Sequence, residues 1–155
     1  MRFSLKTIPL VLALLASSLS SAHAGGHVYS ASNPKWKTEC GACHLAYPPQ
    51  LLPAESWRAM MTQLDKHFGA DASLDVTTAS EIRAFLEANA GGNKREATGK
   101  PTLRITETRW FKHEHEEVPA RVWSSPAVKQ PSNCAACHTQ AERGDFSERS
   151  LRVPR

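Results

Sequence analysis

Two stretches of the chain repeat one pattern: Cys40-Gly41-Ala42-Cys43-His44 and Cys134-Ala135-Ala136-Cys137-His138. In each stretch two cysteines stand three positions apart and a histidine follows directly, and together they use all four cysteines of the chain. Two thiols at this spacing can each bond to one vinyl group at the edge of a haem, and the adjacent histidine can then supply a nitrogen to the iron. Cys-x-x-Cys-His is therefore the attachment signature of c-type haem. The sequence predicts two haem c groups held by six residues: Cys40, Cys43, His44, Cys134, Cys137 and His138.

Other uses of paired cysteines fit the sequence less well. A zinc site could use four cysteines, and two disulfides could use the same residues, but neither requires a histidine directly after each pair. Zinc ribbons also favour much closer pairs, whereas more than half of the chain separates Cys43 from Cys134. A thioredoxin-like redox site would need a βαβ pattern around its cysteines, and the sequence shows none. Covalent haem attachment is the interpretation that explains both histidines.

The segment 1–24 has the pattern of a secretory signal peptide. Arg2 and Lys6 form a basic start, a short apolar run covers 8–16, and Ala22-His23-Ala24 is a small-residue cleavage site followed by Gly25. The apolar run is too short for a membrane anchor, and no other segment reaches spanning length. The sequence therefore predicts a signal peptide at 1–24 and a periplasmic mature chain at 25–155, with no membrane span.

Composition and charge exclude several classes of partner. The full chain has 19 Lys and Arg against 15 Asp and Glu, and the segment 1–24 contributes two of the basic residues and none of the acidic ones. The mature chain is therefore close to neutral. Charges of both signs are interspersed and form no block of five or six like residues, which argues against a nucleic-acid-binding tail or a polybasic membrane patch. The positions of the cysteines and histidines in the sequence instead indicate a role for metal chemistry.

The pattern of apolar and turn residues predicts a mostly helical chain with long loops and little sheet, arranged as two haem-centred lobes at 25–92 and 93–155. The first lobe is expected to contain a helix started by Asn33-Pro34 and reaching Cys40, a helix over 53–68 closed by Gly69, and a helix opened by a capping box at Thr78. The third helix is expected to end at Gly91-Gly92. A polar linker is expected over 93–100.

The second lobe is harder to assign from its sequence. Residues 102–108 are expected to be extended, and 110–123 is ambiguous because Pro119 interrupts it. Ser132-Asn133 is expected to cap a helix that carries the second haem motif, and the tail from Gly144 is expected to be irregular.

Each iron also needs a second axial ligand. Apart from the two motif histidines and His23 of the signal peptide, the candidates are four histidines and two methionines: His27, His67, His113, His115, Met60 and Met61. His67 shares the apolar face of the predicted helix over 53–68, close to an iron that lacks a ligand. The other ligand is expected from the doublet His113 and His115, while the methionines are expected to fill the core.

The chain resembles the bacterial dihaem cytochrome c family. The resemblance rests on the stretch from Cys40 through Tyr47-Pro48-Pro49, on His67-Phe68-Gly69, and on the C-terminal segments 115–119, 133–139 and 144–146. It implies two low-spin irons with two histidines each, His67 and His115 matching the distal positions. It also implies electron transfer between a membrane b-type cytochrome and a small high-spin haem protein.

The expected function is that of an electron carrier and not of an enzyme, since two saturated irons bind no substrate. His67 is assigned to the first haem and His115 to the second, because each lies equally far along the chain from the histidine of its motif, His44 or His138. His115 also lies nearer Val118, whereas His113 adjoins Lys112. The alternatives are the small dihaem subunit of a periplasmic nitrate reductase, which the Tyr-Pro-Pro motif disfavours, and a haem enzyme or gas sensor with one open iron.

Overall fold

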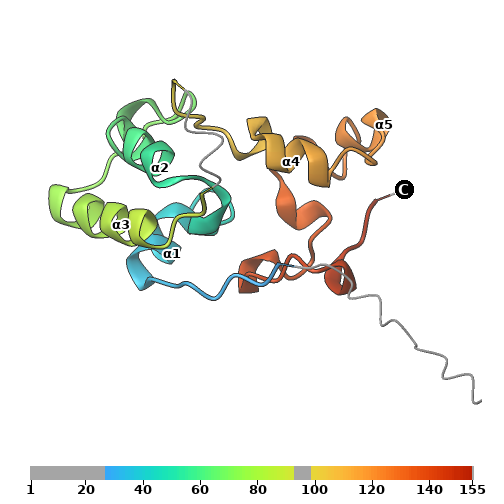
Figure 1. The fold of residues 1–155 in the computed structure, drawn as a ribbon, viewed down its shortest axis with the longest axis horizontal. Helices are drawn as coiled ribbons and strands as arrows, with labels where there is room; N and C mark the ends of the chain where they lie inside the picture. The colour runs from blue at the N-terminus through green and yellow to red at the C-terminus, as the bar shows by residue number, and fades with distance from the viewer. Residues whose placement is uncertain (1–26, 93–98, 155) are drawn as a thin grey trace, which may run out of the picture.

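The computed structural model describes residues 27–92 and 99–154. The predicted signal peptide and positions 93–98 of the predicted linker lie outside these residues. Helices α1, α2 and α3 gather at one end of the molecule, and α4, α5 and the C-terminal turns gather at the other (Figure 1). Extended pairing among the described residues is limited to isolated bridges. The predicted fold class, mostly helical with long loops and little sheet, is confirmed.

Helix α1 spans Pro34–Gly41 and begins as the sequence predicts. The Asn33 side-chain oxygen accepts a hydrogen bond from the Trp36 amide at 2.9 Å, which satisfies a donor that the helix itself leaves unpaired. Pro34 occupies the first helical position, where its missing N–H costs nothing. Cys40 therefore lies in the last turn of this helix.

Helix α2 spans Ala54–Met61 and is shorter than predicted. The Thr62 hydroxyl and the Gln63 amide both donate to the carbonyl of Ala59, at 2.8 and 3.1 Å. These side chains compete for a carbonyl at the helix end, and the helix stops. A 3-10 turn follows at Leu64–Lys66. The expectation that His67 lies on the apolar face of a helix over 53–68 is therefore wrong.

Helix α3 spans Val76–Ala88 and also differs at its start. Its N-cap is Asp75, whose carboxylate accepts from the Thr78 amide at 2.9 Å, so the capping box predicted at Thr78 is wrong. The helix ends just before Gly91. A side chain at position 91 would collide with the backbone of Gln50, which explains the glycine there.

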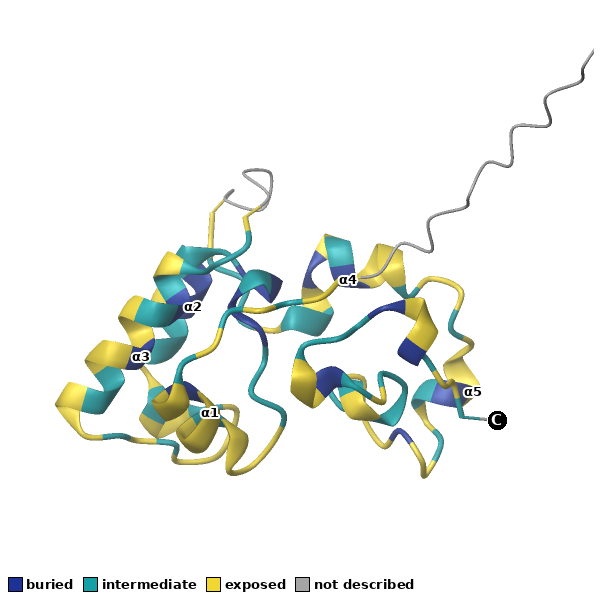
Figure 2. Cartoon of the chain, turned by 90° about the horizontal axis from the view of Figure 1, so that it is seen from below, coloured by how far each residue is buried: buried dark blue, intermediate teal, exposed yellow. Residues whose placement is uncertain are grey.

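The N-terminal end of the molecule has a contiguous apolar core. Figure 2 shows buried positions on α2, on α3 and in the loop that precedes α2. Five large side chains make up this core cluster: Trp36, Leu52, Trp57, Ile82 and Leu86. The Trp57 indole also donates to the Pro49 carbonyl at 2.7 Å, which fixes the Tyr-Pro-Pro segment against α2.

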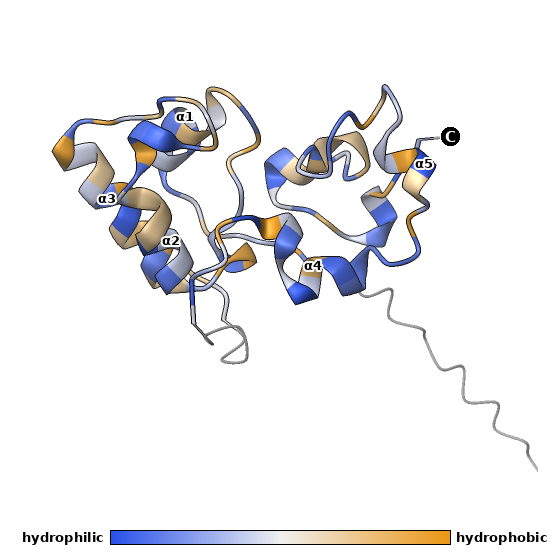
Figure 3. Ribbon diagram, turned by 90° about the horizontal axis from the view of Figure 1, so that it is seen from above, coloured by the Kyte–Doolittle hydropathy of each residue, from blue (hydrophilic) through white to orange (hydrophobic). Residues whose placement is uncertain are grey.

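The C-terminal half is built from short pieces. Helix α4 spans Arg109–Glu114 and α5 spans Ala120–Trp123, with Pro119 as the residue before α5. The predicted extended segment 102–108 instead contains a 3-10 turn at Ile105–Glu107. The helix predicted for the second motif is also wrong, because Cys134–Ala136 forms a 3-10 turn without a side-chain cap. Hydrophilic residues dominate α4 (Figure 3).

Two contacts tie distant parts of the chain together. The His27 carbonyl accepts from the Phe146 amide at 2.9 Å, and the Tyr29 amide donates to the Gly144 carbonyl at 2.8 Å, so the start of the described chain lies against the C-terminal tail. Gly144 has φ of +77°, and a side chain there would collide with the Tyr29 carbonyl. The predicted division into two lobes at 92 and 93 stays a prediction. None of the helices in 27–92 and 99–154 has the length and apolar character needed to cross a bilayer.

Candidate functional site

The first cysteine motif lies at the end of α1 and just after it. Cys40 is half-buried in the last turn, whereas Cys43 is exposed. Burial, and secondly the charge of Glu39, raises the pKa of the Cys40 thiol to about 11. The His44 ring directs Nδ1 at the Leu45 carbonyl at 2.7 Å and stacks on Tyr47, with ring centres 4.8 Å apart. The motif therefore presents two thiols and an oriented imidazole close together in the chain.

The second motif has the same composition on a different local structure. Cys134 starts a 3-10 turn, and burial raises the pKa of its thiol to about 11. Burial also raises the pKa of the Cys137 thiol. None of the four cysteines is joined to another in a disulfide. The structure thus forms neither of the disulfides considered as an alternative, and thiols with raised pKa values stay protonated at neutral pH.

His67 lies opposite His44. The two ring centres are 6.1 Å apart and the ring planes are inclined by 22°. His67 occupies a tight turn after α2, in which Phe68 has φ of +52° and Gly69 has φ of +97°. Burial, and secondly the neighbouring His44, lowers the pKa of His67, so this imidazole is neutral at pH 7. A neutral imidazole is the form that binds a metal.

His115 lies opposite His138 at the same separation. The ring centres are again 6.1 Å apart, but the planes are inclined by 77°. His115 follows the last turn of α4, stacks on Phe111 at 4.1 Å and directs Nδ1 at the Phe111 carbonyl at 2.8 Å. Burial, and secondly His115, lowers the pKa of His138. The second pair therefore also consists of an oriented ring facing a neutral one.

The spacing of both pairs fits an iron between them. An imidazole nitrogen binds a first-row metal at about 2 Å and the ring centre lies roughly 1 Å behind that nitrogen, so rings on opposite sides of one metal have centres about 6 Å apart. In His44 and His115, Nδ1 faces a backbone carbonyl, which leaves Nε2 for the metal. His138 adds a buried Nδ1 with no hydrogen-bond partner among the described residues. The residues present therefore fit two haem groups.

The remaining candidates lie elsewhere. The His113 side chain is 74% exposed, and its Nδ1 lies 3.6 Å from a carboxylate oxygen of Glu116. Met60 and Met61 are partly buried against the N-terminal core, as expected for core residues. Within 27–92 and 99–154, no group of three or more His, Cys, Asp or Glu side chains could hold a metal. The four-cysteine zinc site therefore has no counterpart in the described part of the chain.

Tyr47 has a role that the sequence did not reveal. Its ring stacks on His44, and its hydroxyl donates to the Ser132 carbonyl at 2.7 Å. The same carbonyl accepts from the Cys134 amide at 3.0 Å. Tyr47 thus connects the histidine of the first motif to the first cysteine of the second across most of the chain, a contact that no local pattern could indicate.

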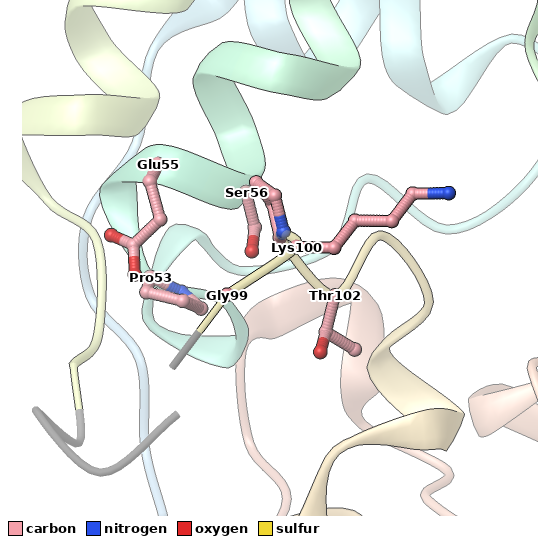
Figure 4. Close-up of a pocket in the computed structure, with 7 residues that line it drawn as sticks. Pro53, Glu55, Ser56, Gly99, Lys100 and Thr102 are labelled. Atoms are coloured by element: carbon pink, nitrogen blue, oxygen red, sulfur yellow. The ribbon is translucent and has the colours of Figure 1, made fainter. Parts of the chain in front are cut away.

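A cavity of about 270 Å³ lies at the start of α2, lined by Pro53, Glu55, Ser56 and residues 99–102 (Figure 4). The Ser56 side chain is fully buried, and its hydroxyl has no partner within the described residues. The lining contains neither a cysteine nor a histidine. The cavity is therefore separate from the two histidine pairs.

A family model described as dihaem cytochrome c matches residues 36–146, which include both motifs and both histidine pairs. The chain belongs to the dihaem cytochrome c family. This dihaem cytochrome accordingly carries two covalently bound haem c groups, and its residues would hold them at the two Cys-x-x-Cys-His motifs. The family resemblance noted from the sequence is confirmed.

Solved structures are similar to this cytochrome over most of its length. A crystal structure of DHC purified from Rhodobacter sphaeroides has 48% identity and a TM-score of 0.65, covering 74% of this chain and 97% of that one. A dihaem cytochrome c from the same organism has 45% identity and a TM-score of 0.68, covering 77% and 99%. A dihaem cytochrome c from Shewanella baltica has 38% identity and a TM-score of 0.68, covering 79% and 93%. A search of curated proteins found no match.

Proposed function

We propose that this dihaem cytochrome c is a periplasmic electron carrier in which both irons have two histidine ligands. The observation that carries the proposal is the pair of opposed imidazoles at each motif, with ring centres 6.1 Å apart in both cases. The ligands are His44 and His67 for one haem and His115 and His138 for the other. When bound, the haem irons supply one-electron redox chemistry.

The residues around each pair hold the ligands in place and exclude other ligands. The Leu45 and Phe111 carbonyls fix the ring orientations of His44 and His115, and such outer partners also raise the basicity of a ligating imidazole. Two imidazoles leave no position for a substrate. The protein therefore acts on electrons alone, and we propose that it is not an enzyme.

Tyr47 supports transfer between the two sites. It contacts His44 through its ring and the backbone before Cys134 through its hydroxyl, so packed atoms bridge the two motifs. Burial raises the pKa of the Tyr47 hydroxyl, which keeps it protonated and able to donate this bond at neutral pH. This hydrogen bond joins the segments that carry the two motifs.

The proposed location rests on the signal-peptide pattern, and the proposed partners rest on the family resemblance. Removal of residues 1–24 during export would place the mature chain in the periplasm. The partners implied by the family resemblance are a membrane b-type cytochrome as one redox partner and a small high-spin haem protein as the other. Stopped-flow mixing of the reduced cytochrome with each purified candidate tests them, and electron transfer no faster than with an unrelated cytochrome would exclude that partner.

Carbon monoxide binding distinguishes the proposed electron carrier from a haem enzyme or gas sensor with an open iron. The gas binds a ferrous haem only where an axial position is free. We expect the reduced protein to show no carbon monoxide difference spectrum at neutral pH. A difference spectrum that accounts for one haem of the two would contradict the four-histidine assignment and favour the open-iron alternative.

A further inference from the structure

The turn that carries His67 holds an aromatic residue in a backbone conformation that such residues rarely adopt. The His67 carbonyl accepts from the Ala70 amide at 3.1 Å, so Phe68 and Gly69 are the two central residues of the turn. Their φ angles are +52° and +97°. Turns with two positive φ angles favour asparagine followed by glycine, whereas a bulky side chain strains the backbone there. The preference of the turn therefore explains Gly69 but not Phe68.

Burial does not explain Phe68 either. The residue is 47% exposed and does not belong to the N-terminal core cluster. Its ring meets the ring of His67 edge-on, with centres 4.9 Å apart and planes inclined by 61°. The guanidinium carbon of Arg104 lies 4.2 Å from the centre of the Phe68 ring, which is the geometry of a cation–π contact. The ring of Phe68 is thus in contact with both a candidate iron ligand and a cation.

The His67 ring lacks the hydrogen bond that orients other candidate ligands. In His44 and His115, Nδ1 is directed at a backbone carbonyl, at 2.7 and 2.8 Å. The His67 side chain makes no hydrogen bond to a residue within 27–92 or 99–154, and the rings that it contacts there are those of His44 and Phe68. Because His44 is the proposed ligand on the other side of the iron, Phe68 is the neighbour that can fix the plane of the His67 ring.

We propose that Phe68 is a positioning residue that sets the plane of the His67 imidazole, and that Arg104 holds Phe68 in place. The inference rests on the proposed function, because it takes His67 as an axial ligand of the first haem. Strained backbone at a functional site persists where the surrounding contacts require it, and here the contact is with a ligand. The plane of an axial imidazole decides which iron orbitals it affects, so Phe68 would tune the first iron without touching it.

Arg104 connects this contact to the second histidine pair. It directly precedes the 3-10 turn Ile105–Glu107, which is followed by α4, and His115 follows the last residue of α4. One continuous stretch, 104–115, therefore contacts the turn of one proposed distal ligand and contains the other.

Electron paramagnetic resonance of the oxidised holoprotein, combined with chemical denaturation, tests the proposal. The signal of the first iron is the low-spin signal that His67→Ala removes. Phe68→Asn removes the ring but tolerates a left-handed backbone, so it should shift the g values of that signal and leave the other signal unchanged. Its denaturation midpoint should be at least as high as that of the native protein. Phe68→Tyr keeps the ring and should give the native signal.

Two exposed positions provide a second test that leaves the turn itself intact. Arg104→Gln removes the cation from the Phe68 ring and should shift the same signal in the same direction as Phe68→Asn, but by less. Glu107→Gln is the matched control. It removes the carboxylate oxygen that lies 3.6 Å from Arg104 Nε but leaves the cation, so it should give the native signal. This pair tests the proposal even if Phe68→Asn fails to fold.

The outcomes separate this inference from the proposed function. A native signal in Phe68→Asn, or an equal shift in Phe68→Asn and Phe68→Tyr, would overturn the proposal and leave Phe68 as a turn residue only. An Arg104→Gln signal that matches the Glu107→Gln signal would remove the role of Arg104. In each case the electron-carrier proposal would stand, because His67→Ala still removes one low-spin signal. Survival of both low-spin signals in His67→Ala would instead contradict the ligand assignment itself.

Discussion

The two halves of the molecule hold their histidine pairs at the same separation but in different orientations. His44 and His67 are nearly parallel at 22°, whereas His115 and His138 are nearly perpendicular at 77°. The difference comes from local structure: His67 lies in a turn with left-handed backbone, and His115 is fixed by its stack on Phe111 at the end of α4. Identical ligands can therefore give two irons with unequal electronic structure.

The halves also differ in what holds them together. The N-terminal half has a contiguous cluster of large buried side chains on three helices and on the loop before α2. In the C-terminal half, short helices and 3-10 turns predominate, and the buried apolar residues are fewer: Phe111, Val122, Val128 and Ala141. Small units with little apolar core need covalent or metal support to fold. We infer that the C-terminal half depends on its haem more strongly than the N-terminal half does.

Removing each haem separately should show the largest difference between the two halves. The double variant Cys134→Ala/Cys137→Ala should lose its haem and the ordered structure of the C-terminal half. The double variant Cys40→Ala/Cys43→Ala should lose the other haem but keep α1, α2 and α3, because large buried side chains from all three helices pack together in one cluster. Mass spectrometry should show one haem adduct in each variant. Limited proteolysis should cut the first variant throughout 99–154 and leave 34–88 of the second intact; equal digestion of both halves would refute the difference.

Removing each distal ligand should open one iron and leave the other unchanged. His67→Ala and His115→Ala should each bind carbon monoxide at one haem when reduced, because an axial position becomes free. The reduction potential of that haem should rise with loss of a donor nitrogen. His113→Ala is the control and should bind none. Carbon monoxide binding by the His113 variant alone would show that the wrong member of the doublet was chosen.

Electron paramagnetic resonance of the unaltered protein should distinguish the ring orientations of the two histidine pairs. Parallel imidazole planes split the iron orbitals along one direction, whereas perpendicular planes oppose each other and leave those orbitals nearly equal in energy. The oxidised protein should therefore show two low-spin signals, an ordinary rhombic one and a strongly anisotropic one. His67→Ala should remove the first and His115→Ala the second. A single type of signal would contradict the different ring orientations.

A core substitution should destabilise the N-terminal half by less than haem loss destabilises the other. Ile82 is fully buried on α3, and Ile82→Ala should cost about 2–5 kcal/mol of unfolding free energy. Val76 lies on the same helix but is 86% exposed, so Val76→Ala should stay within about 0.5 kcal/mol. Chemical denaturation followed by far-ultraviolet circular dichroism measures both. A cost for Ile82→Ala as small as that of its control would show that this cluster does not stabilise the fold.

The sequence predicted the chemistry better than the local structure. Haem attachment depends on cysteine and histidine at a fixed spacing along the chain, and that spacing can be seen directly in the sequence. The equal separations along the chain, from His44 to His67 and from His115 to His138, also anticipated which rings would face each other, although iron ligation itself stays a prediction. The helix expected to carry His67 was wrong, because side chains that follow α2 bond back to the Ala59 carbonyl and end the helix early.

Features set by distant contacts could not be predicted. The hydrogen bond from Tyr47 to Ser132 joins residues that lie far apart in the sequence. The ring angles of 22° and 77° depend on side-chain torsions. Helix starts were predicted unevenly for a simpler reason. The proline that follows Asn33 allows only one starting position for its helix. Asp75 and Thr78 can both cap the same helix, and only packing decides between them.

The cap of α4 offers a smaller test in the C-terminal half. The buried Thr108 hydroxyl accepts from the Phe111 amide at 3.0 Å and donates to the Ile105 carbonyl at 2.8 Å. Thr108→Ala should cost about 1 kcal/mol of unfolding free energy. Because α4 positions His115, the loss should appear as faster proteolysis near the second haem, whereas Thr108→Ser should behave as the native chain. Equal proteolysis rates for the alanine and serine variants would show that the cap does not hold α4.

The cap of α3 should add a weak acid sensitivity confined to the N-terminal half. Hydrogen bonds from Thr78 lower the pKa of Asp75 from its ordinary value of 3.8. A carboxyl with a lowered folded-state pKa stabilises the fold above its unfolded pKa, and that contribution disappears as the pH falls through the folded value. Asparagine caps a helix about as well as aspartate but does not titrate. Asp75→Asn should therefore match the native chain at pH 7 and lose less stability between pH 5 and about pH 2, measured as thermal unfolding of α3 helicity; identical acid profiles for the two proteins would show that this carboxylate contributes nothing to stability.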